Sequence, residues 1–262
     1  MLVFYTYLNF ILGLDLILIL FLQHSTIIVH LLKIILMAKF LYLFAVSLLI
    51  ASCQDSKNNS QYSTEGLSPE ETVAMKIAQA NGIEKWDDVE ELKFTFNVKR
   101  AESAMARSWS WKPHNQEITM TNPTDSVTYN RTTMDSLAIT TDKGFINDSY
   151  WLLAPYHLVW DSGTTLKIQD TATAPLSQKM MSKITLTYGN EGGYTPGDAY
   201  DFYYDDDFMV QEWVFRKANG QEPSMITTWE DYEDYKGLKI AKTHNSQGDL
   251  KLYFSDIEVT ME

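Results

Sequence analysis

The sequence predicts a mainly β domain of the α+β class: a curved antiparallel sheet of about ten strands, one leading helix, and short inserted helices. Three observations lead to this fold class. Apolar residues recur at helical spacing over residues 69–81, the spacing changes to every second residue from Leu92 onward, and an aromatic segment at residues 142–161 interrupts that alternation. Because alternation leaves one polar face on each strand, one side of the sheet is expected to be packed.

The leading helix is predicted over residues 69–81. Ser68 suits the N-cap, Pro69 the first helical position and Glu71 the partner position of a capping box. The apolar face consists of Val73, Ile77 and Ala80, widened by Ala74 and Met75. Asn81-Gly82 then supplies the signal that ends the helix.

The strands are predicted from alternating apolar residues between turn signals such as Asn122-Pro123 and Asn219-Gly220. The expected strands cover residues 92–100, 105–111, 116–120, 126–129, 165–169, 183–188, 200–204, 209–216, 224–232, 238–244 and 251–259. The interruption at 142–161 is the most aromatic part of this region, and Pro155 divides it into two short helical pieces. A helix before the sheet and short helices within it are the layout of a half-barrel.

A lipid-anchoring signal precedes the domain. Ile50-Ala51-Ser52-Cys53 resembles the lipobox of bacterial lipoproteins, in which the cysteine is lipidated and becomes the new N-terminus. Residues 37–52 have the form of a signal peptide, with a positive start at Lys39 and an apolar core from Phe40 to Leu49. Cys53 is the single cysteine of the chain and lies between an apolar segment and a polar tract. This place favours lipidation over a buried structural thiol.

The chain is therefore predicted to divide into four parts. Residues 1–36 are read as an over-extended start, with initiation at Met37, or as an extra apolar segment long enough to span a bilayer. Residues 37–52 form the lipoprotein signal peptide, and residues 53–66 a flexible polar tether. Residues 67–262 form the β-rich half-barrel domain, of a size that supports one core.

The charge of the expected mature chain restricts its partners. Lys33, Lys39 and Asp15 are the only charged residues before Cys53, which leaves 19 basic and 33 acidic residues from there on, a net charge of −14. Such a chain lacks the basic face that nucleic acid requires. Anionic lipid would also repel it, so the membrane partner must be held through acyl chains on Cys53. Because no second cysteine exists, stability must come from an ordinary core.

The sequence combines the lipobox, the leading helix, the 92–100 strand, the block Phe145-Ile146-Asn147-Asp148-x-Tyr150-Trp151-Leu152-Leu153 with Pro155-x-His157-Leu158-x-Trp160-Asp161, and the acidic and aromatic strands after Tyr200. This combination resembles an uncharacterised family of Bacteroidota lipoproteins over about residues 65–262. Its layout is similar to the LolA/LolB lipoprotein-carrier half-barrel. This resemblance implies binding of an acyl or other apolar ligand, and it carries over no catalytic residue.

Large aromatic side chains are the candidates to line or cover a ligand cavity. They are Trp109, Trp111, Tyr150, Trp151, Tyr156, Trp160, Trp213 and Trp229. For any single residue the simpler interpretation is ordinary core packing. Taken together, they bring more apolar area than a one-sheet fold with few helices covers without a cavity.

The sequence contains only weak matches to catalytic and metal-binding motifs. Asp161-Ser162-Gly163-Thr164 resembles the signature of aspartic proteases, but that chemistry needs two aspartates and no second copy occurs. The segment also suits a helix cap and turn. Asp205-Asp206-Asp207 lacks the spacing of a calcium loop and suits a solvated hairpin tip, and the histidines lack zinc-like spacing. We therefore expect no catalytic residue, metal or cofactor.

The expected function is that of a lipid-anchored envelope lipoprotein, non-catalytic, which binds an apolar or acyl ligand in the concave sheet. Gln54 follows the lipidated cysteine where an aspartate would favour inner-membrane retention, so the outer membrane is expected. Two alternatives stay open: an envelope scaffold or interaction module with a packed core, and an aspartic-type hydrolase that uses Asp161.

Replacing the lipobox cysteine tests the anchor. We expect Cys53→Ser to abolish lipid attachment and membrane retention, because the thiolate is the nucleophile that accepts the acyl-glycerol group. Metabolic labelling with palmitate, followed by membrane fractionation, measures both. Equal label in the variant and the native protein would contradict the prediction.

Overall fold

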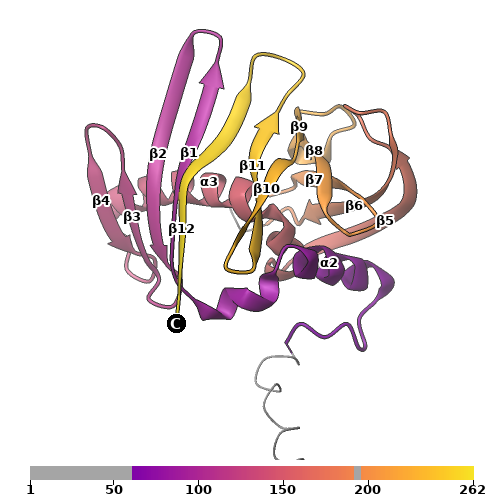
Figure 1. Cartoon of the computed structure of the whole chain (residues 1–262), viewed down its shortest axis with the longest axis horizontal. Helices are drawn as coiled ribbons and strands as arrows, with labels where there is room; N and C mark the ends of the chain where they lie inside the picture. Colours follow the sequence, from indigo (N-terminus) through magenta and orange to yellow (C-terminus); the bar gives the residue numbers. More distant parts are fainter. Residues whose placement is uncertain (1–60, 192–195) are drawn as a thin grey trace, which may run out of the picture. The chain divides into compact units, whose positions relative to one another are not determined.

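The computed structural model describes residues 61–191 and 196–262, which belong to a compact unit, Asn59–Glu262. Two antiparallel sheets build this unit (Figure 1). The larger has seven strands in the spatial order β10 (Glu230–Tyr235), β11 (Leu238–Asn245), β12 (Lys251–Met261), β1 (Val89–Arg100), β2 (Ser103–Lys112), β3 (Glu117–Thr121) and β4 (Ser126–Asn130). The smaller has five in the order β5 (Thr164–Thr173), β6 (Met180–Tyr188), β7 (Ala199–Tyr204), β8 (Val210–Arg216) and β9 (Met225–Thr228).

The prediction of a mainly β fold with antiparallel strands is confirmed, but the prediction of one curved sheet is wrong. There are two sheets, and neither is closed or strongly curled. The predicted strand 224–232 is in fact two strands separated by Trp229: β9 pairs with β8, and β10 pairs with β11. Alternation of apolar and polar residues indicates a half-buried strand but does not indicate which strand pairs with it. The change from one sheet to the other at Trp229 could therefore not be predicted from the pattern.

The leading helix forms as predicted. Helix α2 (Pro69–Ala80) begins with a full capping box, in which the Glu71 amide donates to Ser68 Oγ at 3.2 Å and the Ser68 amide donates to Glu71 Oε2 at 2.8 Å. Asn81 caps its end, and Gly82 follows with a φ of +87° and leads into the 3₁₀ helix η1 (Ile83–Asp88). Tyr62, inside the predicted tether, is buried, and its carbonyl accepts from Gln79 Nε2 at 2.9 Å.

The aromatic segment forms two helical pieces that meet at a kink, as predicted, but the kink lies at Leu153 rather than at Pro155 and the first piece begins earlier. Helix α3 (Ser136–Trp160) begins six residues before the predicted segment, where Asp135 Oδ1 accepts from the Ala138 amide at 2.8 Å. Its non-helical residue is Leu153, with φ −125° and ψ 22°. Because a proline ring clashes with the carbonyl four residues earlier, the distortion falls before Pro155 itself.

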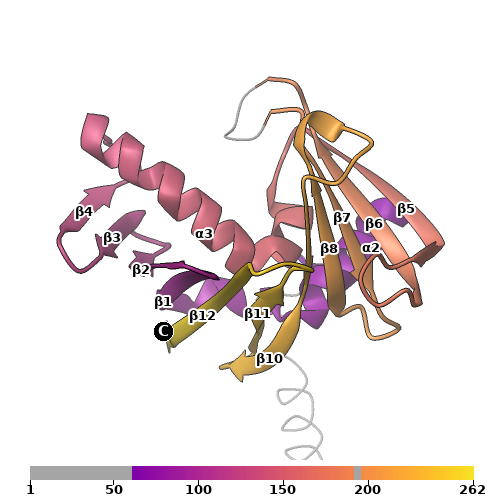
Figure 2. The same cartoon turned by 90° about the horizontal axis from the view of Figure 1, so that it is seen from above.

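Helix α3 and the two sheets enclose the main core. Figure 2 shows α3 crossing the seven-stranded sheet from β4 toward β11. The side chains between them include Phe94, Trp109, Ile118, Phe145 and Leu152, all buried. The five-stranded sheet gives its inner face to the same core, through residues such as Phe202, while a small separate apolar cluster covers part of its opposite face. No helix within residues 61–191 and 196–262 combines the length and apolar character needed to cross a membrane.

The turn after α2 allows a stability test. A Cβ atom on Gly82 would lie 1.8 Å from the carbonyl oxygen of Gly237 and would require an unfavourable positive φ. We expect Gly82→Ala to lower the free energy of unfolding by more than about 2 kcal/mol. Gly66→Ala is the matched control, since Gly66 also has a positive φ (+82°) but no atom lies within 4 Å of the place that its Cβ would take. Urea unfolding measures both, and equal losses would contradict a steric role for Gly82.

Candidate functional site

The eight predicted aromatic residues lie in three places. Two are in β2, four in α3, and Trp213 and Trp229 in or beside the five-stranded sheet. Five are buried: Trp109, Trp151, Tyr156, Trp213 and Trp229. The other three are half-buried and pack against the same core: Trp111, Tyr150 and Trp160. The structure therefore brings all eight to one core, but in separate clusters.

The first cluster lies under α3 and around η1. Trp109 and Trp111 both pack against Phe145, with ring centroids 5.5 and 5.2 Å apart. Trp86 of η1 lies between Trp111 and Trp160, and its ring centroid is 4.9 Å from that of each. Trp86 was not predicted to belong to this cluster, because its place in a short 3₁₀ helix gives no periodic signal in the sequence. This cluster closes the core at the end of α3.

The second cluster follows the line along which the two sheets meet, and we call it the intersheet seam. It consists of Trp151, Trp213, Thr227, Trp229 and His244. Ring centroids are 4.4 Å apart for Trp151 and Trp213, 5.4 Å for Trp151 and His244, and 4.5 Å for Trp229 and His244. Thr227 is the register partner of Trp213 on the neighbouring strand. The seam thus joins α3, the β8–β9 pair and β11.

Four polar atoms of the intersheet seam are buried and have no hydrogen-bond partner among the described residues. They are Trp213 Nε1, Thr227 Oγ1, Trp229 Nε1 and His244 Nε2. An unsatisfied buried polar atom costs about 1–3 kcal/mol, and most proteins avoid it. Four in one place are therefore a feature that requires an explanation.

His244 is neutral in the seam. Its Nδ1 lies 3.2 Å from the Thr228 carbonyl oxygen, so Nδ1 carries the proton and Nε2 is left as an acceptor. Burial lowers the pKa of His244 to about 3. The seam consequently presents two indole N–H donors, one hydroxyl and one imidazole acceptor, set among aromatic carbon. This combination suits the polar end of a largely apolar molecule.

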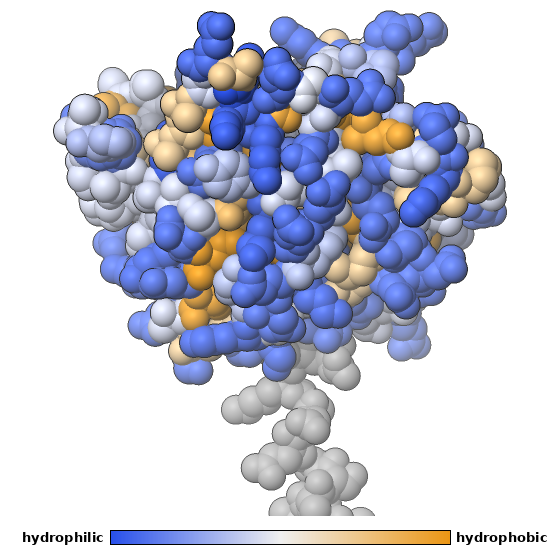
Figure 3. Space-filling model, turned by 45° about the horizontal axis from the view of Figure 1, so that its top comes forward, coloured by the Kyte–Doolittle hydropathy of each residue, from blue (hydrophilic) through white to orange (hydrophobic). Residues whose placement is uncertain are grey.

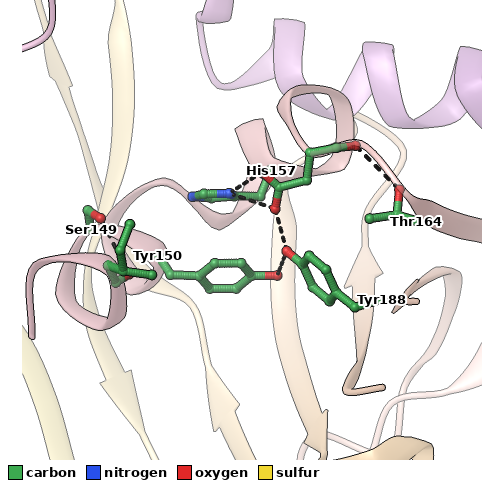
Figure 4. Close-up of polar contacts among 7 residues, drawn as sticks. Ser149, Tyr150, His157, Thr164 and Tyr188 are labelled. Atoms are coloured by element: carbon green, nitrogen blue, oxygen red, sulfur yellow. Dashed lines mark hydrogen bonds and ion pairs between the residues drawn. The ribbon is translucent and has the colours of Figure 1, made fainter. Parts of the chain in front are cut away.

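Asp161, the candidate for aspartic-type catalysis, ends α3 and lies in a local network (Figure 4). Its carboxylate accepts from His157 Nδ1 at 3.0 Å and from the Tyr188 hydroxyl, whose oxygen lies 3.4 Å from that of Tyr150. Burial by itself would raise the pKa of Asp161, but the hydrogen bonds and charge of His157 and the Tyr188 hydroxyl outweigh it and lower the pKa. The network joins the end of α3 to β6 and acts as a cap. Among the described residues, no second carboxylate is bonded to it.

Two aspartates of α3 are buried and paired, and neither was predicted from the sequence to have a structural role. Asp148 accepts from Arg107 Nε at 2.9 Å, from Arg107 Nη2 at 2.6 Å and from Trp109 Nε1 at 2.8 Å. Asp142 accepts from the Tyr129 hydroxyl at 2.9 Å and pairs with Arg131 Nε at 3.1 Å. A signal existed, because Asp142 falls on the helical stripe that also carries Ala138 and Phe145.

Other candidates take structural roles or fall outside the described residues. Asp205 accepts the amides of Asp207 and Met209 through Oδ1, as expected of a hairpin tip. Within residues 61–191 and 196–262, no group of three or more His, Cys, Asp or Glu side chains is placed to hold a metal ion. The lipobox residues Ile50, Ala51, Ser52 and Cys53 lie outside the described residues, so lipidation stays a prediction.

The described residues form, among others, surface cavities of about 580 and 430 Å³, and the eight aromatic residues line neither of these two. The larger lies on the outer face of the five-stranded sheet, with Lys167, Asp201 and Arg216 among its lining. The smaller lies beside the β7–β8 hairpin, at Tyr204 and Asp205. The role of the aromatic residues in a ligand cavity stays a prediction.

Comparisons with known proteins give matches to solved structures. No family model and no curated protein matches the sequence. A DUF1329 family protein from Desulfovibrio piger has a TM-score of 0.44 at 9% identity, covering 72% of this chain and 91% of that one. A LolA superfamily protein from Nitrosomonas europaea has a TM-score of 0.43 at 7% identity, covering 75% and 96%. An outer membrane lipoprotein-sorting protein domain from Vibrio parahaemolyticus has a TM-score of 0.41 at 12% identity, covering 71% and 93%.

A LolA superfamily protein and a lipoprotein-sorting protein domain are thus among the solved structures that this chain resembles, in line with the predicted similarity of layout. Membership in a family of Bacteroidota lipoproteins stays a prediction.

The neutral state of His244 predicts a pH dependence of stability. Because the folded-state pKa lies below the ordinary value of 6.5, the unfolded chain binds the proton first as pH falls. The contribution of neutral His244 to the free energy of unfolding is fully present above pH 6.5. Below pH 6.5 it decreases, by at most about 1.4 kcal/mol per pH unit. We expect His244→Phe to make the free energy of unfolding less dependent on pH between pH 6.5 and 5, as measured by urea unfolding. The exposed His114→Gln is the control, and parallel curves for His244→Phe and wild type would contradict the assignment.

Proposed function

We propose that this chain is a non-catalytic, lipid-anchored envelope lipoprotein that holds an apolar or acyl ligand along the intersheet seam. The observation that carries the proposal is the group of four buried, unpartnered polar atoms among large aromatic side chains. A ligand carbonyl or carboxyl oxygen would accept from the indole N–H groups of Trp213 and Trp229. A ligand hydroxyl would donate to His244 Nε2.

The apolar part of the ligand would lie against the aromatic surface that continues from the seam. Tyr200 stacks on Trp213 and on Phe215, with both centroid separations at 5.2 Å, and Tyr150 packs on Tyr200 at 5.0 Å. These side chains contact each other through ring faces rather than through interlocked aliphatic groups. A chain of methylene groups inserted between them would exchange one set of apolar contacts for another, at small cost.

The break in α3 supplies a route of access. Before the break, Asp148 fixes the helix to β2 through Arg107 and Trp109. After it, the Tyr156 hydroxyl donates to the Asn81 carbonyl at 2.6 Å. The non-helical residue Leu153 lies between these two attachments and only two residues after Trp151. A rotation at Leu153 would move the last turns of α3, and with them His157, whose ring stacks on Tyr150 at 4.4 Å. This movement would open the aromatic surface beside the seam.

The anchor follows from the sequence. Acyl chains on Cys53 would hold the protein in the membrane, and Gln54 favours the outer membrane. The face of the domain in Figure 3 is mostly hydrophilic with short apolar strips. Large exposed apolar side chains in the described residues are confined to Met105, Leu137, Ile139 and Met180. This surface supports anchoring by lipid rather than by the domain itself.

A second candidate function is an envelope scaffold with a packed core. It is favoured by the packing of the eight aromatic residues, all of which belong to or pack against one core. In that case the seam would be a closed contact between sheets, and the chain would act through its surface.

Removing one indole N–H separates the two functions. We expect the unit Asn59–Glu262 to bind an apolar fluorophore with a carboxylate, such as an anthroyloxy fatty acid, and Trp213→Phe to weaken binding about tenfold. An aromatic ring is kept, so the loss of stability should be smaller than for replacement of Trp213 by alanine. Trp111→Phe is the matched control, because Trp111 Nε1 is also buried and unpartnered but lies outside the seam.

Fluorescence titration and urea unfolding measure binding and stability for the three proteins. Mass spectrometry of the purified wild type would in addition detect an acyl ligand carried through purification. Absence of saturable binding by the wild type would favour the scaffold. Equal affinities for the three proteins would contradict a ligand site at the seam.

A further inference from the structure

The outer face of the five-stranded sheet carries a polar groove that the proposed function does not use. Its volume is about 580 Å³. Its floor follows the strand register: Lys167, Thr185, Asp201 and Val214 are successive partners across β5, β6, β7 and β8. These side chains point away from the core that holds the intersheet seam, because the neighbouring residues Ile184, Leu186 and Trp213 point into it. We call this surface the outer groove.

One wall of the outer groove is the loop between β5 and β6, and a buried carboxylate fixes it. Glu212 is 3% exposed and accepts the amides of Leu176 and Ser177 at 2.7 and 2.8 Å. Within the loop, the Gln178 amide donates to the Ala174 carbonyl at 3.0 Å. The loop is therefore held in one conformation over the sheet.

The opposite wall is the connection between β8 and β9, which includes the 3₁₀ helix η2 (Lys217–Asn219). Arg216 reaches from the floor to this wall: Nε donates to Asp201 at 2.9 Å, and Nη1 donates to Asn219 Oδ1 at 2.6 Å. Asp201 also accepts from the Thr185 hydroxyl at 2.5 Å. The floor and both walls are thus preorganised, which lowers the entropic cost of binding.

Two lysines give the outer groove its unpaired charge. Neither Lys167 nor Lys183 forms an ion pair with any described residue. Lys183 lies over the Tyr203 ring at 5.7 Å, and Lys167 is exposed on the adjacent strand. The two lysines are diagonal neighbours on one face, where the spacing is about 7–8 Å, within reach of two long side chains that converge on one anion. This positive site lies on a chain whose overall charge is strongly negative.

We propose that the outer groove binds an acidic saccharide. Lys167 and Lys183 hold a carboxylate of the sugar through charge-assisted hydrogen bonds. The remaining lining is rich in hydroxyl and amide groups, which match the hydroxyl groups of a sugar ring: Thr165, Thr187, Gln169 and Gln221. The groove is a binding site without a reaction, since its one carboxylate, that of Asp201, is engaged by Arg216 and Thr185.

The test uses trigalacturonic acid as the probe, with maltotriose as its neutral counterpart and inorganic phosphate as a simple anion. We expect calorimetry on the unit Asn59–Glu262, which contains a complete core, to show binding of the acidic trisaccharide that weakens with added salt. Amide shifts in a ¹H–¹⁵N spectrum should concentrate on β5, β6 and the two wall loops. The double variant Lys167→Gln/Lys183→Gln should bind at least about tenfold more weakly.

The matched control is Lys99→Gln/Lys239→Gln, which removes the same charge from exposed positions of the seven-stranded sheet and should leave affinity unchanged. An equal loss of affinity in both double variants would mean that overall charge explains the effect, and it would overturn the proposal. Equal binding of maltotriose would overturn the requirement for an acidic sugar, and equal binding of phosphate alone would overturn the saccharide class. Absence of binding would overturn the whole proposal. Fatty-acid binding at the seam is measured separately and should be the same in all these variants, so failure here is distinct from failure of the proposed function.

Discussion

The burial of two aspartates of α3 against arginines of the seven-stranded sheet and its edge is the constraint on which the rest of the domain depends. Asp142 and Asp148 are fully buried, and each is paired with an arginine that is itself partly buried. Burial raises the pKa of Asp148, although the hydrogen bonds and charge of Arg107 oppose the rise. Removing one partner of such a pair leaves an uncompensated charge and costs about 3–5 kcal/mol. The pairs therefore determine where α3 lies and in which rotation.

The placement of α3 decides what the intersheet seam contains. With Asp148 fixed to β2, the next turn directs Trp151 toward Trp213 and His244. Leu153 then bends the helix, and Tyr156 and Asp161 attach its last turns to α2 and β6. The five-stranded sheet consequently has two chemically different faces. The inner face is aromatic with a few unpartnered polar atoms, and the outer face is polar with two unpaired lysines.

Several features could be predicted because they depend on neighbours in sequence. The capping box of Ser68 and Glu71 and the stop at Asn81-Gly82 are local signals, and α2 forms where they indicate. The strands follow the period-two alternation, which is set by burial of one face. Core packing was the simpler interpretation of each aromatic residue, and all eight contact the main core, since their area must be covered. The break near Pro155 was predicted from the proline, and only its exact residue differed.

The remaining features were decided by tertiary structure. The chain passes from one sheet to the other at Trp229, and alternation is the same whether a strand pairs to its left or its right. The burial of Asp142 and Asp148 depends on arginines that lie 11 and 41 residues away in sequence. The unpartnered atoms of the seam come from strands and a helix far apart in the chain. By itself the sequence determined which residues form helices and strands and which faces are apolar, because these depend on local geometry and on hydrophobicity. Which faces meet is a property of long-range pairing, and only the folded chain decides it.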